Sequence, residues 1–328
     1  MVRGLVLGKF YPLHNGHLGL INFAAARCDE LYVLLCASDK ETIPGSIRLK
    51  WLKDTVAHDE NIQPVLYNYS ETDLPNSSVP SQKAAAAWSK VIEQLVPSPD
   101  IFFSSEAYGE LVAGYLHCIH IPFDPQRRQN PINASVIRNH PLQHWNDIAP
   151  AARSYFTKKI CIYGTESTGK STLTEQLAKH YQTEYVPEMA REIVEDTDTV
   201  TIDNLVQIAE LHANTIRLKM QRANRFLFVD TDLNITRSYS KFLFNRELNV
   251  RAWVEEVNQF DLYLYLDNDV PLVQDGTRLD ETRRNELNEY HKRELSERNI
   301  SYELVSGDWD DRLQKAIAVI DRVFELSD

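Results

Sequence analysis

The sequence predicts two α/β domains in one chain, each built on a doubly wound parallel sheet. The chain has 328 residues, and domains hold roughly 100–200 residues each. Its hydrophobic fraction of 43% and charged fraction of 25% are those of globular proteins. Short apolar runs alternate with helix-length amphipathic segments, and this alternation starts again near Lys159. Strands separated by helices pair in parallel through right-handed crossovers, so we expect one domain over residues 1–148 and a second over 149–328.

The first domain is predicted from strands and helices that alternate along its length. The apolar runs expected to form its strands are Val2–Leu7, Leu31–Ala37, Pro64–Tyr67, Ile101–Ser104 and Ile119–Phe123. The segments expected to form its helices are Asn15–Arg27, Ile47–Ala57 and Gln82–Leu95. Asn15 is the expected N-cap of the first helix, because its side chain can accept a hydrogen bond from a free amide of the first turn.

The second domain shows the same alternation. Its expected strands are Ile160–Tyr163, Phe226–Val229, Leu262–Leu266 and Tyr302–Val305. Its expected helices are Lys170–Tyr181 and a last helix that Asp308 can cap and that ends near Leu326. The stretch between His140 and Lys158 contains Pro141 and Pro150, and we expect a short helical connector there.

The charge and the cysteines exclude several classes of protein. Lys and Arg number 35 and Asp and Glu number 47, which gives a net charge of −12. Duplex DNA is bound through Lys and Arg, so no nucleic-acid partner is expected, although a nucleotide needs only a local cationic pocket. The four cysteines have no CxxC or metal-type spacing, which favours a reducing compartment. With no secretory leader pattern and no apolar stretch long enough for a bilayer, we expect a cytoplasmic protein without a membrane partner. Whether the chain forms a homo-oligomer stays open.

A loop with two histidines follows the first predicted strand. It runs from Gly8 through Lys9 and Phe10 to His14 and His17, where the first helix begins. Gly8 lets the backbone turn and approach a ligand, and the amides of a helix N-terminus attract an anion. The two histidines share one face, because residues three apart on a helix are neighbours. We therefore predict a phosphate site, and metal binding is the weaker interpretation because no Cys or acidic ligand is close in sequence.

This loop matches the pattern GxFxPxHxGH and so resembles the nucleotidyltransferase superfamily that includes the NMN and phosphopantetheine adenylyltransferases. A second segment, Ile132–Arg138, is similar to the ISxTxIR motif of that family. Asn133 replaces the usual Ser and Ser135 the usual Thr, and both are short polar residues that can cap a helix. Asp124–Arg127 resembles a DPxR element of the NMN-specific members.

The resemblance implies a Rossmann-like domain that transfers an adenylyl group. The 5′-phosphate of NMN would attack the α-phosphorus of ATP and release pyrophosphate, giving NAD. An ionised phosphate needs no general base, so catalysis would consist of positioning and charge stabilisation. Trp51, in an RxxW pattern with Arg48, and Trp88 are candidates for stacking on the nicotinamide ring. The residues implied to bind ATP or stabilise charge are Gly8, Lys9, Phe10, His14, His17, Arg48, Asn133, Ser135 and Arg138.

A second phosphate loop follows the first strand of the second domain. Gly164–Thr172 matches GxxxxGK[ST] in full, between a predicted strand and a predicted helix. Lys170 would reach the β- and γ-phosphates and Ser171 would ligate Mg²⁺. A later apolar run ends in Asp230, which has the form of a Walker B carboxylate that faces the metal directly or through water. The residues expected to bind the nucleotide are Gly164, Glu166, Ser167, Thr168, Gly169, Lys170, Ser171 and Thr172.

Glu184–Glu192 indicates that this second domain is a small-molecule kinase. The segment resembles one found in ribosylnicotinamide kinases related to deoxynucleoside kinases. The resemblance implies that Glu188 takes the proton from the 5′-hydroxyl of the substrate and that Arg191 steadies the phosphates. Asp230 is the other candidate for the base, and the choice between the two stays open.

A predicted lid follows the third apolar run of this domain. Asp275–Arg278 has the sequence DGTR and resembles a DGxR lid. Arg278, with Arg283 and Arg284, would then close over the phosphates and neutralise charge in the transition state. The alternative is an ordinary solvated start of a helix with mixed charge.

Both sets of motifs, in this order, make the chain similar to the NadR-type family of bifunctional enzymes, which join an NMN adenylyltransferase to a ribosylnicotinamide kinase. The resemblance implies a P-loop kinase that makes NMN from ribosylnicotinamide and ATP, and an adenylyltransferase that converts NMN and a second ATP to NAD, with Mg²⁺. Two alternatives stay open: another fusion, such as a phosphopantetheine adenylyltransferase with a different kinase, and a non-catalytic sensor of NAD or ATP. Some members carry an N-terminal helix-turn-helix domain. The first predicted strand begins at Val2, so we expect neither that domain nor operator binding.

Overall fold

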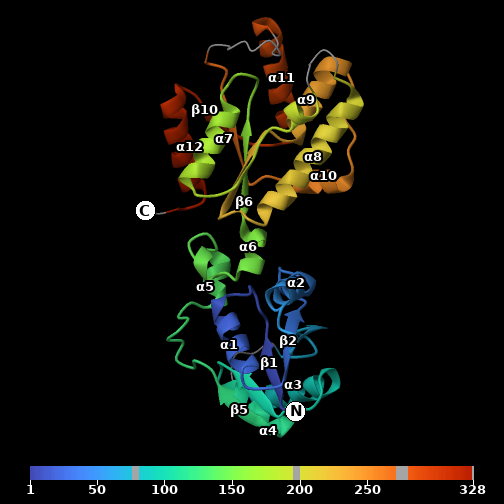
Figure 1. The fold of residues 1–328 in the computed structure, drawn as a ribbon, viewed down its shortest axis with the longest axis vertical. Helices are drawn as coiled ribbons and strands as arrows, with labels where there is room; N and C mark the ends of the chain where they lie inside the picture. The colour runs from blue at the N-terminus through green and yellow to red at the C-terminus, as the bar shows by residue number, and fades with distance from the viewer. Residues whose placement is uncertain (76–80, 195–199, 271–279, 327–328) are drawn as a thin grey trace. The chain divides into compact units, whose positions relative to one another are not determined.

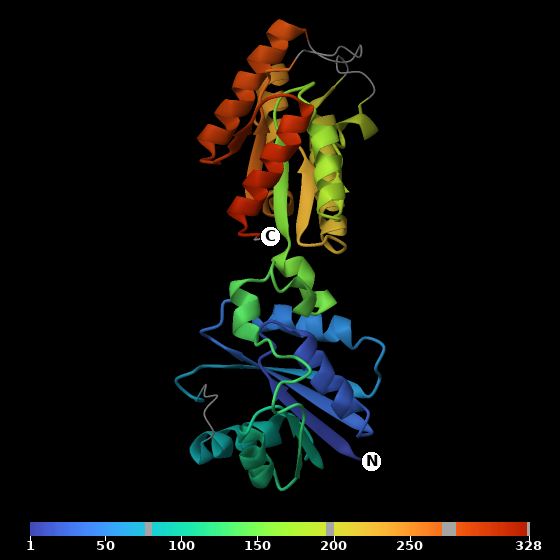
Figure 2. The ribbon, with the colours of Figure 1, turned by 90° about the vertical axis from the view of Figure 1, so that its left-hand side faces the viewer.

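The computed structural model describes residues 1–75, 81–194, 200–270 and 280–326. They belong to two compact units, Met1–Arg153 and Ser154–Asp328 (Figures 1 and 2). The boundary between the units lies after residue 153, whereas the sequence predicts a boundary after residue 148. Helix α6 (Pro150–Phe156) crosses the observed boundary. Among the described residues, no helix combines the length and the apolar character needed to cross a bilayer.

The first unit is a parallel sheet covered by helices on both faces. Its strands are β1 (Arg3–Gly8), β2 (Glu30–Ser38), β3 (Ile62–Tyr69), β4 (Ile101–Ser104) and β5 (Ile119–Pro122), in the spatial order β3-β2-β1-β4-β5. Its main helices are α1 (Asn15–Ala25), α2 (Gly45–Thr55), α3 (Gln82–Leu95) and α4 (Tyr108–Leu116). Because the crossovers are right-handed, α1 and α2 lie on one face and the contacting pair α3 and α4 on the other.

The second unit repeats this architecture. Its strands are β6 (Lys158–Tyr163), β7 (Tyr185–Val186), β8 (Phe226–Asp230), β9 (Leu262–Leu266) and β10 (Glu303–Val305), in the order β10-β9-β6-β8-β7. Helices α7 (Lys170–His180) and α12 (Trp309–Val323) contact each other, as do α9 (Leu233–Phe244) and its neighbours α8 (Ile202–Met220) and α11 (Glu281–Glu297). The short helix α10 (Ala252–Val257) packs against α8. The predicted fold class, two doubly wound parallel-sheet domains, is confirmed.

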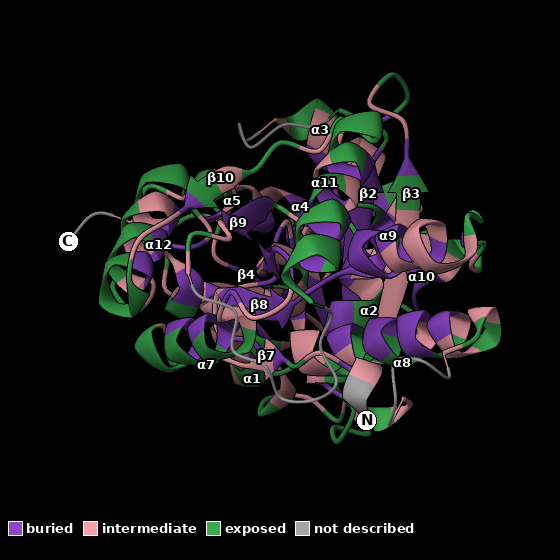
Figure 3. Cartoon of the chain, turned by 90° about the horizontal axis from the view of Figure 1, so that it is seen from above, coloured by how far each residue is buried: buried purple, intermediate pink, exposed green. Residues whose placement is uncertain are grey.

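The strands supply the cores of both units. Buried residues are concentrated on the strands and on the inward sides of the helices, while the outer helix faces are exposed (Figure 3). In the first unit, Leu5, Leu34 and Phe102 from three neighbouring strands join one apolar cluster with residues of α3 and α4. These sheets are buried on both faces, which explains why the sequence shows continuous apolar runs rather than strict alternation.

Candidate active sites

The loop after β1 lies where the strand order of the first sheet reverses. The chain moves from β1 to β2 on one side and later returns to pair β4 with the other side of β1. In such sheets the carboxyl ends of the strands open a crevice that binds ligands. Here the crevice is a cavity of about 780 Å³, lined by the loop, by residues that follow β2, β4 and β5, and by the start of helix α5 (Ala134–Asn139).

His14 and His17 cap the first turn of α1. The expectation that Asn15 is the N-cap is wrong: His14 takes this position, and its Nδ1 accepts a hydrogen bond from the Gly16 amide at 3.1 Å. The His14 amide in turn donates to Nδ1 of His17 at 3.3 Å, and the ring centroids lie 3.8 Å apart. Since both Nδ1 atoms accept, the proton of each neutral ring is assigned to Nε2, on the opposite side of the ring.

The surroundings keep both imidazoles neutral. Burial lowers the pKa of His14 from 6.5 to about 4, with Arg127 adding to the shift and Asp147 opposing it. Burial also holds the pKa of His17 well below its usual range, helped by His14 and Arg127. Both rings line the cavity. The pair therefore offers two Nε2–H donors to a ligand, and oxygen atoms of a phosphate chain are suitable acceptors.

A buried arginine holds this loop from behind. Arg48 is fully buried; its Nη1 donates to the Lys9 carbonyl at 2.8 Å, and its Nη2 pairs with Glu41 at 2.8 Å. The Lys9 ammonium lies 3.2 Å from the same carboxylate and at the cavity wall. Phe10 is buried under the loop with its ring edge-on to His17. The described wall does not include Arg48, so its position supports the loop, and a direct contact with the nucleotide stays a prediction.

The second predicted motif of this unit forms the start of α5. Asn133 is the N-cap and accepts a hydrogen bond from an amide of the first turn at 3.0 Å. Arg138 donates to the Ser135 hydroxyl at 3.0 Å and to the Tyr11 carbonyl, and its guanidinium lies 4.1 Å from the Tyr11 ring centroid. Asn133, Ser135 and Arg138 line the same cavity as the histidines, so the fold brings the two motifs to one site.

The rest of this cavity wall is aromatic and acidic. Trp88 lines it and meets the Tyr69 ring edge-on at 5.0 Å, whereas Trp51 is 4% exposed inside α2 and is absent from the described wall. Sequence reasoning missed Tyr69, Glu71 and Glu106, which also line the cavity. The one signal that could have found them is their position at or just after the carboxyl ends of β3 and β4.

The second loop connects β6 to α7, where the other sheet reverses its strand order. Gly164 and Gly169 have φ angles of 140° and 82°, a region that favours glycine. A Cβ on Gly169 would also lie 2.2 Å from the Trp309 ring. A cavity of about 830 Å³ begins at this loop, and its wall includes every P-loop residue predicted to bind the nucleotide: Gly164, Glu166, Ser167, Thr168, Gly169, Lys170, Ser171 and Thr172.

Ser171 and Asp230 form a pair of oxygen ligands at this loop. The Ser171 hydroxyl donates to Oδ2 of Asp230 at 2.5 Å, and the Lys170 ammonium donates to the Thr165 carbonyl at 2.9 Å. Mg²⁺ prefers hydroxyl and carboxylate oxygens, and commonly takes one or two protein ligands with phosphate oxygens and waters. The described residues contain no group of three His, Cys, Asp or Glu that could hold a metal alone. The pair therefore fits Mg²⁺ bound together with a nucleotide.

The two candidate bases have different positions. Glu188 lines the cavity with Lys170, whereas Asp230 is fully buried behind Ser171 and is absent from the described wall. The sequence analysis did not single out two further cavity residues on helices, His212 and His291, which are 4% and 1% exposed. No local pattern marks either of them.

The structure does not bring the arginines predicted to bind the phosphates of the kinase site into the described cavity wall. Arg191 lies in a single 3-10 turn, and its side chain is outside the described part of the chain. Arg278 lies outside the described residues. Arg283 is exposed on α11 with its guanidinium 5.3 Å from the Phe242 ring centroid, and it is absent from the described cavity wall. Their roles toward the phosphates stay predictions.

Long-range contacts fix the backbone of the P-loop. The buried Arg312 donates from Nη1 to the Thr168 carbonyl at 2.8 Å, and Arg284 donates from Nε to the Glu166 carbonyl at 2.9 Å. The Tyr239 hydroxyl donates to the Glu166 carboxylate at 2.6 Å. These residues belong to α12, α11 and α9, so three separate helices hold the loop in place.

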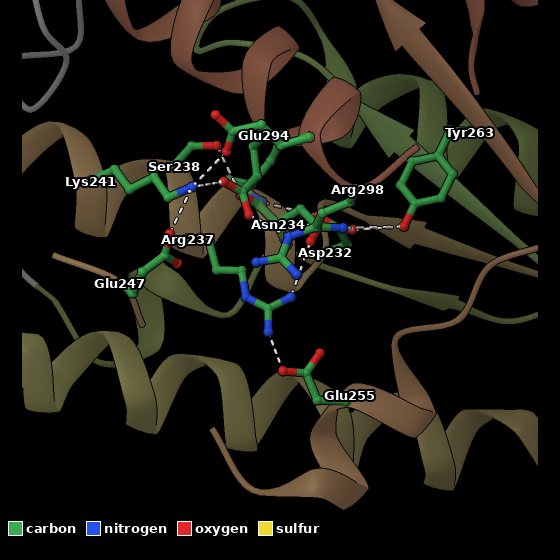
Figure 4. Close-up of polar contacts among 12 residues, drawn as sticks. Asp232, Asn234, Arg237, Ser238, Lys241, Glu247, Glu255, Tyr263, Glu294 and Arg298 are labelled. Carbon is green, nitrogen blue, oxygen red and sulfur yellow. Dashed lines mark hydrogen bonds and ion pairs between the residues drawn. The ribbon is translucent and has the colours of Figure 1, made fainter. Parts of the chain in front are cut away.

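An ion-pair network joins α9 to α11, two helices that also carry residues of the second cavity wall (Figure 4). Glu294 is 1% exposed and accepts hydrogen bonds from Lys241 at 2.7 Å and Arg298 at 2.5 Å. Burial opposes ionisation, but these two partners together lower the pKa of Glu294.

At the start of α9, Tyr263 donates to the capping residue Asp232 at 2.8 Å, and burial raises the pKa of Asp232 to about 6. The network holds the helix that carries Tyr239.

Comparison with known proteins points to one group of relatives. A family model described as an AAA domain matches residues 159–312. The trifunctional NAD biosynthesis/regulator protein NadR of Escherichia coli is 30% identical over 345 aligned residues, covering 97% of this chain and 82% of that protein. A nicotinamide-nucleotide adenylyltransferase of Thermococcus onnurineus is 24% identical over 170 aligned residues, which cover 48% of this chain and 83% of that protein. A crystal structure of a NadR protein in complex with NR has the same fold, with a TM-score of 0.78 at 23% identity over 98% of this chain and 96% of that one.

Proposed function

Because this chain belongs to the NadR family, we propose that it is an NAD salvage enzyme with two transferase activities. Its kinase activity phosphorylates ribosylnicotinamide to NMN, and its adenylyltransferase activity converts NMN and ATP to NAD and pyrophosphate. The observation that carries the proposal is the presence of two separate phosphate-binding loops, each at the reversal point of its own parallel sheet. We assign the adenylyltransferase to residues 1–148 and the kinase to residues 149–328.

In the adenylyltransferase, the nucleophile is the phosphate of NMN, so the protein has to align two phosphates and stabilise the charge that develops. His14 and His17 line the cavity, and their Nε2–H groups donate to the triphosphate. Ser135 and Arg138, on the short helix α5, bind the β- and γ-phosphates. Fixed neutral donors in a partly buried site need no reorganisation when charge moves to the leaving pyrophosphate. Of the two tryptophans predicted to stack on the nicotinamide ring, Trp88 lines the described cavity wall and Trp51 does not, which supports this role for Trp88.

In the kinase, the acceptor is a ribose hydroxyl that must lose its proton. The P-loop amides and Lys170 bind the phosphates, and Ser171 with Asp230 holds Mg²⁺, which neutralises phosphate charge when bound. We assign the proton to Glu188 rather than Asp230. Glu188 lines the cavity, whereas the Asp230 carboxylate already accepts the Ser171 hydroxyl. Both reactions consume ATP, and we propose that the protein works in the cytoplasm.

A steady-state assay of the purified protein tests this function. Mg-ATP is supplied with each of five acceptors in turn: ribosylnicotinamide, nicotinic acid riboside, NMN, nicotinate mononucleotide and phosphopantetheine. We expect NMN from ribosylnicotinamide and NAD from NMN. Adenylylation of phosphopantetheine in place of NMN would identify another fusion, and stoichiometric binding of ATP or NAD without product would identify a sensor.

A further inference from the structure

One face of helix α8 lines the kinase cavity and changes from apolar to polar along its length. Leu205, Ile208 and His212 all line this cavity and lie on one stripe, because residues three, four and seven apart share a face of a helix. Seven residues at roughly 1.5 Å each span about 10 Å, comparable to the length of a nucleoside. The apolar end of the cavity also contains Val194 and Val200, and the polar end lies beside β8.

His212 has one ring nitrogen in use and one that is not. The side chain is 4% exposed. Burial lowers the pKa of His212 to about 4, so the imidazole is neutral. A hydrogen bond to the backbone of Asp230 acts in the opposite direction and raises the pKa, which is the effect of a bond that a ring N–H donates. Within the described part of the chain, Nε2 is the buried ring nitrogen that has no hydrogen-bond partner. In the neutral ring Nδ1 therefore carries the proton and donates to the Asp230 carbonyl, which leaves a bare lone pair on Nε2.

A buried acceptor without a donor costs roughly 1–3 kcal/mol, so such a group at a cavity wall indicates a ligand that supplies the donor. Ribosylnicotinamide has donors in its ribose hydroxyls and its carboxamide. His212 is tied to the residue whose carboxylate bonds Ser171, so it belongs to the phosphate-transfer end of the cavity. The apolar end at Leu205 and Val200 suits the pyridine ring, which places the ribose beside His212.

We propose that Nε2 of His212 accepts a hydrogen bond from a secondary hydroxyl of the ribose and thereby selects ribonucleosides over deoxynucleosides as the acceptor. The proposal rests on the kinase function proposed above. It assigns His212 to specificity and binding, not to proton removal from the reacting 5′-hydroxyl, which is the role of Glu188. A site built to bond a substrate hydroxyl discriminates strongly against an analogue that lacks it, since a buried polar group is then left unpaired.

Two substitutions separate recognition from support of the fold. The amide of Asn reaches the position of Nδ1, so His212→Asn keeps a donor for the Asp230 carbonyl and loses the acceptor at Nε2. The amide of Gln reaches the position of Nε2, so His212→Gln keeps an acceptor and loses the bond to Asp230. We expect kcat/KM for ribosylnicotinamide to fall about tenfold or more in His212→Asn and by less in His212→Gln. The exposed His180 provides a matched control as His180→Asn, with no change expected.

The decisive measurement pairs these variants with 2′-deoxy and 3′-deoxy ribosylnicotinamide. For the hydroxyl that bonds His212, we expect the deoxy substrate to lose about tenfold or more with the wild-type protein and to lose little further with His212→Asn. Losses that multiply for both analogues would overturn the proposal, as would equal losses in His212→Asn and His212→Gln. Thermal unfolding of the same samples reports on folding of the second unit, because NAD formation from NMN is assigned to the first unit. If the wild-type protein does not phosphorylate ribosylnicotinamide, the proposed kinase function fails instead.

Discussion

The two phosphate-binding loops occupy equivalent places in their sheets but present different donors. In the proposed mechanism the first loop uses side chains, the Nε2–H groups of His14 and His17, whose tautomers are set by backbone amides of the same helix start. The second loop surrounds the nucleotide site with backbone, and glycines at φ angles of 140° and 82° allow its shape. Each loop depends on a fully buried arginine that donates to one of its carbonyls, Arg48 to Lys9 and Arg312 to Thr168.

This difference shows that a phosphate loop has two separate requirements. The donors can come from imidazoles or from backbone amides, because either supplies N–H groups at fixed positions. The carbonyls on the far side of the loop still have to be bonded, since buried backbone groups without partners are costly. Both units meet the second requirement in the same way, with a guanidinium from a distant helix.

The largest expected effect is loss of these buried arginines. Arg48→Met leaves the carboxylate of Glu41 without its buried partner, and Arg312→Met does the same to Asp269. Removing one member of a buried pair costs about 3–5 kcal/mol, so we expect Arg48→Met to lower the free energy of unfolding of its unit by about that amount. The loss in Arg312→Met should be smaller, because the Asp269 side chain is 37% exposed and solvent screens its charge. Denaturant unfolding, followed by the activity assigned to each unit, measures both. Lys50 and Arg322 form exposed ion pairs with Asp54 and Glu303 and provide the controls. Lys50→Met and Arg322→Met should each change the free energy of unfolding by less than about 1 kcal/mol. An equally small effect for the buried arginines would show that the loops do not depend on them.

The next effect concerns the donors themselves. His17→Ala should lower NAD formation from NMN about 10²–10³-fold and spare phosphorylation of ribosylnicotinamide, because one fixed donor to developing charge is lost. Lys170→Ala should do the reverse by a similar factor. Initial rates of both reactions in each purified variant, with circular dichroism as a check of folding, test this. Loss of both activities in a folded single variant would contradict the assignment of two independent sites.

The parts of these sites that could be predicted from the sequence are those encoded within a few residues. The histidine loop, the P-loop, Asn133 as a cap and the pair of Ser171 with Asp230 all follow from local patterns at the ends of apolar runs. The supports could not be predicted, since Arg312 meets Thr168 across 144 residues and Tyr239 meets Glu166 across 73. Such contacts depend on how distant helices pack against the loop, and no local sequence pattern encodes them.

Two local expectations show a different limit of sequence reasoning. Asn15 is a better N-cap than histidine by residue type, yet His14 caps α1 because the reciprocal bond with His17 is available one turn later. The sequence predicts Arg48 at the nucleotide, and that contact stays a prediction, because a motif does not say which way a long side chain points. The structure directs it to the Lys9 carbonyl and Glu41.

A smaller effect separates the glycines of the two loops. Gly169→Ala puts a side chain at a φ of 82° and a Cβ 2.2 Å from the Trp309 ring, so the unit should lose about 2 kcal/mol or more, and kinase activity should fall. Gly8→Ala brings its Cβ 3.1 Å from the Phe10 ring at an ordinary φ, and we expect a smaller loss. Thermal unfolding of both variants gives the comparison. Adding Trp309→Ala to Gly169→Ala should restore the part of the free energy of unfolding that the contact with the Trp309 ring removes. If nothing is restored, the whole loss comes from the backbone conformation at residue 169.

The smallest expected effect is a pH dependence that the side-chain donors of the first loop produce. The pKa of His14 is lowered from 6.5 to about 4, so between these values the unfolded chain binds a proton that the folded chain does not. The free energy of unfolding must therefore fall as the pH falls through this window, by about 1 kcal/mol for one such group between pH 7 and 5.5. His14→Asn keeps a good N-cap and cannot titrate, so the variant should lose this part of the slope. Denaturant unfolding of the first unit at several pH values measures it. An unaltered slope in His14→Asn would mean that folding does not lower the pKa of His14, and the conclusion that burial keeps this imidazole neutral would have to be given up.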